Sequence, residues 1–117
     1  MRVEETINIK KILDVKKILE DCFTYNLNIK SLRKELESCN NKKLQDKIVN
    51  EINCLTEKVM KVRTLINSLK GSSVRLVIRM RYINLMSFKD IANELNVTYQ
   101  WVNKLHNDGL EQLSKML

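Results

Sequence analysis

The chain contains no proline, and its 117 residues include only two glycines, Gly71 and Gly109. Aromatic residues make up 5% of it, so the aromatic and β-branched runs that favour strands are also missing. Lysine, leucine, glutamate and methionine, which favour helices, dominate instead. This composition predicts an all-α fold. The length allows one domain or two small ones, which argues against a large catalytic cleft between two big lobes.

Long apolar runs are missing as well. No stretch approaches the roughly 20 consecutive apolar residues of a membrane-spanning helix. Met1 leads into a polar, charged segment, whereas a secretory signal peptide would continue with an apolar core. The sequence therefore predicts a cytoplasmic protein that does not enter a membrane.

The residue types that bind metals or carry catalysis are few and scattered. Cys22, Cys39 and Cys54 lack the short paired spacing of a zinc site or a redox pair, so we expect reduced thiols. No Ser, Cys or carboxylate is placed near the single histidine, His106, as a catalytic triad requires. Paired carboxylates and a glycine-rich phosphate loop are also missing. We expect no metal, no cofactor and no enzymatic activity, and a surface or packing role for His106.

Positive charge is in excess. The formal net charge is +7 and the isoelectric point is near 9.4, which favours a polyanionic partner, either nucleic acid or an anionic membrane surface. Residues 1–70 hold 15 basic and 10 acidic side chains, so much of the excess lies there. Their lysines, such as Lys10, Lys11, Lys16 and Lys17, are interspersed with acidic residues, which is typical of a solvated face. Some of them could also attract a polyanion or touch its phosphates.

Two apolar repeats with alternating steps of three and four residues fill much of residues 1–70. This spacing forms the seam of an amphipathic helix that packs against another helix. Asn40 and Asn41 separate the repeats, and asparagine tolerates the left-handed backbone of a tight turn. Gly71 supplies a stop. We therefore predict an antiparallel, coiled-coil-like helical hairpin. The repeats are Val15, Ile18, Cys22, Tyr25, Ile29, Leu32, Leu36 and Cys39, then Ile48, Ile52, Leu55, Val59, Val62, Ile66 and Leu69.

Additional apolar residues lie beside these seams, namely Leu19, Phe23, Leu27 and Leu44. They widen the apolar face of the hairpin, which a second copy could cover by forming a four-helix bundle. We therefore predict a homodimer that assembles through the N-terminal helices. The alternative is that these residues pack on the C-terminal part of the same chain, and periodicity does not separate the two cases.

Residues 71–117 predict three shorter helices. Ser72 and Ser73 offer N-caps for the first helix, which we expect to end near Asn84. Its apolar residues are Val74, Leu76, Val77, Met80 and Tyr82. Ser87 begins the second helix, with Asp90 three residues later as in a capping box, and Thr98 caps the third. The apolar residues of the second are Phe88, Ile91, Ala92 and Leu95, and those of the third are Tyr99, Val102, Leu105, Leu110 and Leu113.

The second and third of these helices have the spacing of a helix-turn-helix. That motif needs a small residue where its helices cross, a positive-φ residue in the turn, and apolar anchors on both sides. Ala92 and Asn96 meet the first two needs. The anchors are Ile91, Leu95, Val97, Val102 and Leu105. The sequence therefore predicts that residues 71–117 form a domain that binds double-stranded DNA.

With Val102 and Leu105 facing inward, helical periodicity turns Tyr99, Gln100, Asn103, Lys104 and Asn107 outward. Amide side chains pair with adenine, a lysine reaches guanine or a phosphate, and a tyrosine touches a thymine methyl or a phosphate. Asn107 lies a turn further on and would touch the backbone or solvent. The predicted DNA-binding residues are Thr98, Tyr99, Gln100, Asn103, Lys104, Asn107, Arg79 and Arg81.

Two features beside this face have alternative interpretations. Arg79 and Arg81, together with Arg75, either grip phosphates or form the solvated face of their own helix. Trp101 either packs on the preceding helix, buried or partly exposed, or lies against the DNA backbone. Large aromatic side chains are mostly buried, so we favour packing.

The stretch RMRYINLMSFKDIANELNVTYQWVNKLHNDGLEQL resembles region 4 of bacterial sigma factors, which reads promoter DNA. It is also similar to small phage and prophage regulators of Gram-positive bacteria. The shared residues are Arg81-Tyr82, Ser87-Phe88, Ile91-Ala92, Thr98-Tyr99 and Leu105-His106. Two residues differ from the pattern of these regulators. Trp101 stands where they usually have a polar residue. Gly109 stands where they usually have alanine, and glycine would loosen the end of the third helix.

The resemblance implies a transcriptional regulator that works beside RNA polymerase, often as an activator of late phage genes. Our leading hypothesis is a dimeric, sequence-specific regulator that binds double-stranded DNA. The alternative is a structural or adaptor protein, such as a small phage DNA-packaging subunit, in which the long helices assemble a ring.

Overall fold

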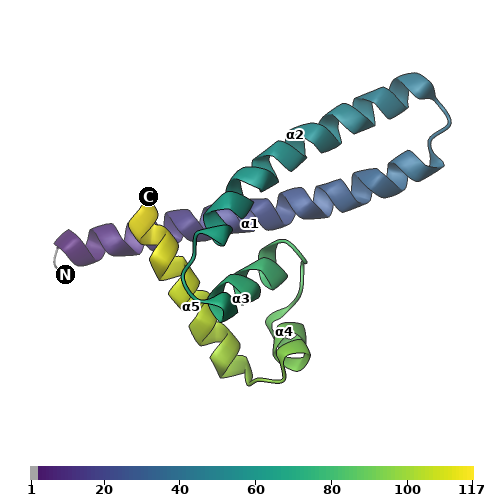
Figure 1. Ribbon diagram of the computed structural model, residues 1–117. Helices are drawn as coiled ribbons and strands as arrows, with labels where there is room; N and C mark the ends of the chain where they lie inside the picture. The colour runs from purple at the N-terminus through teal and green to yellow at the C-terminus, as the bar shows by residue number, and fades with distance from the viewer. Residues whose placement is uncertain (1–2) are drawn as a thin grey trace.

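The computed structural model describes residues 3–117, and over these residues the chain forms five α-helices and no strand. The predicted all-α fold is confirmed. The helices are α1 (Val3–Ser38), α2 (Lys42–Asn67), α3 (Ser72–Tyr82), α4 (Phe88–Leu95) and α5 (Tyr99–Met116). Helices α1 and α2 form a long antiparallel hairpin, and the three shorter helices gather on one side of it (Figure 1). Between residues 3 and 117, no helix combines the length and apolar character needed to cross a bilayer.

The hairpin turn lies at the predicted asparagines, but it forms in a different way. Helix α1 ends at Ser38 and α2 begins at Lys42. Asn41 has an extended backbone with φ of −95°, where the sequence suggested a left-handed one. Its side-chain oxygen accepts a hydrogen bond from the Leu44 N–H at 3.2 Å. Asn41 therefore works as the N-cap of α2, a role that suits asparagine equally well.

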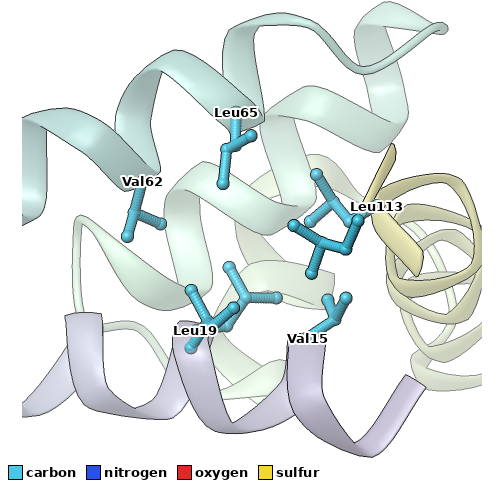
Figure 2. A pocket seen from close by; sticks show the side chains of 7 residues that line it. Val15, Leu19, Val62, Leu65 and Leu113 are labelled. Atoms are coloured by element: carbon cyan, nitrogen blue, oxygen red, sulfur yellow. The ribbon is translucent and has the colours of Figure 1, made fainter. Parts of the chain in front are cut away.

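A single apolar core joins the hairpin to the shorter helices. Figure 2 shows side chains from α1, α2 and α5 that point toward one another across a small apolar hollow. They include Val15, Leu19, Val62, Leu65 and Leu113. One continuous core includes residues from both 1–70 and 71–117. The division of the chain into these two domains stays a prediction.

The apolar residues beside the seams divide into two groups. Leu19 is buried in the shared core and Phe23 packs against it, which is the alternative we gave for these residues. Leu27 and Leu44 remain 44% and 45% exposed. Packing within the chain thus accounts for only half of the widened apolar face.

Helix α3 differs from its prediction in its cap and in its buried face. Gly71, with φ of +93°, is the N-cap, and no side chain caps the helix, so Ser72 and Ser73 do not serve as predicted. The helix ends at Tyr82, slightly before Asn84. Leu76, predicted to be buried, is 39% exposed, whereas Ile78, which was not among the predicted apolar positions, is fully buried. At 100° per residue Ile78 shares a face with Val74, and Leu76 lies opposite them.

Gly109 is buried where α5 crosses α3. A Cβ atom at this position would lie 2.7 Å from Cγ1 and 2.8 Å from Cδ1 of Ile78. These distances are shorter than any normal contact, so the absence of a side chain lets the two helices approach closely. The free energy gained by this close packing offsets the low helix propensity of glycine.

We therefore expect Gly109→Ala to destabilise the protein by about 1–2 kcal/mol, because overpacking costs more than the gain in helix propensity. Thermal unfolding followed by circular dichroism measures the effect. Asp108→Ala is the control, since it raises helix propensity at the exposed neighbouring position. A Gly109→Ala variant as stable as the control, or more so, would contradict the close-packing role.

Candidate nucleic-acid interface

Side-chain caps and one left-handed residue shape the chain from α4 to α5, as the sequence predicts. The Ser87 hydroxyl accepts a hydrogen bond from the Asp90 N–H at 3.1 Å at the start of α4. Asn96 has φ of +55° and ψ of +47°, the left-handed conformation that turns the chain. Thr98 Oγ1 then accepts from the Trp101 N–H at 3.1 Å and caps α5.

The predicted anchors hold α4 against α5. Ile91 and Val102 are fully buried, and Ala92 and Leu105 are each 7% exposed. Leu95 and Val97 are partly buried and pack against the same core. The small side chain of Ala92 is thus buried in the same core as the anchors of α5, as a helix-turn-helix requires. This packing fixes which side of α5 is covered.

The uncovered side of α5 carries the predicted base-reading residues. Six residues from the predicted set are exposed together at its N-terminal half: Thr98, Tyr99, Gln100, Asn103, Lys104 and Asn107. The Tyr99 ring meets Phe88 edge-on, with 5.9 Å between their centroids, which restricts its orientation. The contact of these six residues with DNA stays a prediction.

The two arginines predicted to bind DNA make contacts within the chain. Arg79 Nη2 donates to Asn67 Oδ1 at 2.8 Å, which ties α3 to the end of α2. The Arg81 guanidinium lies 5.0 Å from the Phe23 ring and 5.4 Å from the Phe88 ring, and it donates to the Met86 carbonyl at 3.0 Å. These contacts give both residues a structural role, while a phosphate contact by either one stays a prediction.

Trp101 lies on α5 outside the core. It is 45% exposed, and the Lys104 ammonium lies 5.1 Å from the centre of its ring. This geometry is a cation–π contact, which keeps the ammonium beside the helix. Trp101 is therefore not a core residue, while packing on the preceding helix and a contact with the DNA backbone both stay predictions.

His106 is a packing residue, one of the two roles expected from the sequence. It is 6% exposed, and its Nε2 lies 2.6 Å from the hydroxyl of Tyr82, so a hydrogen bond joins α5 to α3. Burial lowers the pKa of His106; a side-chain hydrogen bond with Asn107 raises it, and the nearby Arg81 and Lys16 lower it further. Burial likewise raises the pKa of Tyr82 to about 12.

Sequence reasoning missed that α1 borders this site. Asn26 of α1 donates to the Tyr82 carbonyl at 3.1 Å, at the end of α3. Phe23 of the same helix stacks on Arg81. Leu19 and Phe23, both beside the main seam, gave the available signal, but periodicity does not identify their partner.

Comparison with known proteins agrees with this geometry. Residues 74–115 match the protein family described as Sigma-70, region 4. The match covers α3 and α4 and nearly all of α5. Comparisons with curated proteins and with solved structures found no match. Over these residues the chain is thus similar to region 4, and its α4 and α5 form a helix-turn-helix.

The buried His106 predicts a pH dependence of stability. Its pKa in the folded chain lies below the ordinary value of 6.5, so the unfolded chain binds more protons once the pH falls through that value. The stability that neutral His106 contributes is therefore present above pH 6.5 and is lost progressively below it. We expect the melting temperature to decrease as the pH is lowered from 7 to 5.5. The decrease should be smaller in His106→Gln, which retains a hydrogen-bonding side chain for Tyr82. Parallel curves for the two proteins would contradict this assignment.

Proposed function

We propose that this protein is a transcriptional regulator that binds a specific duplex DNA sequence through α5. The observation that carries the proposal is the row of exposed polar side chains on a helix whose opposite side is anchored by Val102 and Leu105. The family match over residues 74–115 supports it, because region 4 domains belong to the DNA-binding class.

The dimensions and chemistry of α5 suit the major groove. An α-helix with its side chains is about 10–12 Å wide, and the groove is about 12 Å wide. Gln100 and Asn103 are exposed and carry amides that can form paired hydrogen bonds with adenine. Lys104, beside Trp101, brings a positive charge to the same end of the helix. This set supplies both base contacts and attraction to phosphates.

The finer proposal is that the protein acts in the cytoplasm beside RNA polymerase, as an activator of late genes in a phage or prophage. The resemblance of residues 79–113 to small phage regulators supports it, as does the family match. Within this proposal the protein has no enzymatic activity, and the helix-turn-helix recruits or stabilises polymerase at a promoter.

Replacing the base-reading amides tests the proposal. After selection of a preferred site from random duplexes, we expect wild-type protein to prefer that site over scrambled DNA by roughly a thousandfold or more. Gln100→Ala and Asn103→Ala should each lose about 1–3 kcal/mol of discrimination at one base position, measured by fluorescence anisotropy.

The matched control is Asn53→Ala, which removes an exposed amide from α2. It should bind like wild type. If no motif emerges from selection, the regulator proposal fails. If a motif emerges but both α5 variants match the control, α5 does not read the bases.

We also propose that the protein is a homodimer that assembles through its hairpin. Exposed apolar side chains on α1 and α2 support this, namely Leu27, Leu44, Val49 and Met60. A two-fold dimer would space its recognition helices about 34 Å apart, or a multiple of that, to reach successive major grooves. Sedimentation equilibrium should give twice the chain mass, and Leu44→Gln with Met60→Gln should shift the protein toward monomer. A wild-type monomer at micromolar concentration would contradict it.

A further inference from the structure

Two hollows lie between α1 and the C-terminal helices. The first, of about 460 Å³, is lined by Lys16, Glu20 and Thr24 of α1 together with Asn103 and Asn107 of α5. The second, of about 520 Å³, is lined by Lys11 and Ile12 of α1 together with Asn107 and Glu111. Asn107 thus borders both hollows. Helix α1 passes the C-terminal half of α5 (Figure 1), and the hollows beside it reach Asn103 and Asn107, two of the proposed DNA-binding residues.

The charged side chains around these hollows are mainly basic. Four are basic and two are acidic: Lys11, Lys16, Arg81, Lys115, Glu20 and Glu111. Lys115 and Glu111 pair with each other at 3.7 Å. The Arg81 guanidinium is occupied by two aromatic rings and a carbonyl.

Lys11 and Lys16 are the basic groups that face the hollows with exposed side chains and make no salt bridge within the part of the chain described. The charge of Lys16 also reaches into the helix-turn-helix, because it helps to lower the pKa of His106 on α5. An anion seated beside Asn103 would meet the field of the same ammonium.

A helix that nearly fills the major groove brings both of its flanks close to the sugar–phosphate walls. One of these two walls would pass Asn103 and Asn107 of α5. Helix α1 lies on the same side of α5 as these two residues. We propose that Lys11 and Lys16 bind phosphates of this wall, so that the hairpin is part of the DNA interface. The inference rests on the proposed function and adds a second DNA-contacting element outside residues 74–115.

The experiment compares two matched pairs of substitutions in the full chain. Lys11→Gln with Lys16→Gln removes two charges beside α5, and Lys43→Gln with Lys47→Gln removes two exposed charges near the hairpin turn. Both variants have the same net charge, so the long-range electrostatic attraction between protein and DNA changes equally. We expect the first pair to weaken binding at least roughly tenfold more than the second, for selected and scrambled duplexes alike.

Salt dependence gives a second readout. A plot of log affinity against log salt concentration has a negative slope, and each lost phosphate contact reduces its magnitude by about 0.9. The Lys11 and Lys16 variant should therefore lose a slope of about 1.8, and the control pair much less. Unchanged thermal unfolding in both variants confirms that the fold is intact.

Removing a negative charge should act in the opposite direction. Glu20 lines the same hollow as Lys16, so Glu20→Gln should tighten DNA binding more than Glu51→Gln, its exposed counterpart on α2. If wild type binds DNA but the α1 variants match their controls, the inference is overturned and the proposed function stands. If wild type binds no duplex, the proposed function itself fails and the inference with it.

Discussion

The packing of α1 against α5 determines how this protein presents its surface. Val15 and Leu19 of α1 are almost fully buried, in contact with a core that includes Leu113 of α5 and Val62 of α2. Each such side chain contributes about 1.5–3 kcal/mol through the apolar area that it removes from water. Without these contacts α5 would lose its support on one side, and the hairpin would be held to the shorter helices mainly through α3.

The sequence predicts the structure best where a local rule decides it. Ser87 and Thr98 cap their helices, and Asn96 takes the left-handed conformation, because each residue satisfies a need within four positions of itself. Hydrophobic spacing likewise identifies Ile91, Val102 and Leu105 as buried. The same kind of rule was wrong for Ser72 and Ser73, since Gly71 already begins α3 without a side-chain cap.

Contacts between distant segments could not be predicted in this way. The sequence predicts that Arg81 binds DNA phosphates or lies on the solvated face of its helix, and it does not predict the contacts of its guanidinium with the rings of Phe23 of α1 and Phe88 of α4. The sequence predicts that Gly109 loosens its helix, and it does not predict that a side chain at this position would collide with Ile78 of α3. In both cases the residue's role depends on a partner from another helix, and a single sequence does not identify that partner.

The position of α1 also gives the distribution of charge a physical meaning. On one helix, Val15 and Leu19 face the core while Lys16 and Glu20 face the hollow beside α5, because neighbouring residues are about 100° apart around the axis. The contacts that stabilise the fold therefore also set the distance between the hairpin lysines and the proposed reading face. A rigid link of this kind lowers the entropy cost of placing those lysines on a phosphate wall, since the helix is ordered before DNA arrives. The same lysines on a flexible tail would attract DNA equally at long range, but would contribute less once α5 was seated in the groove.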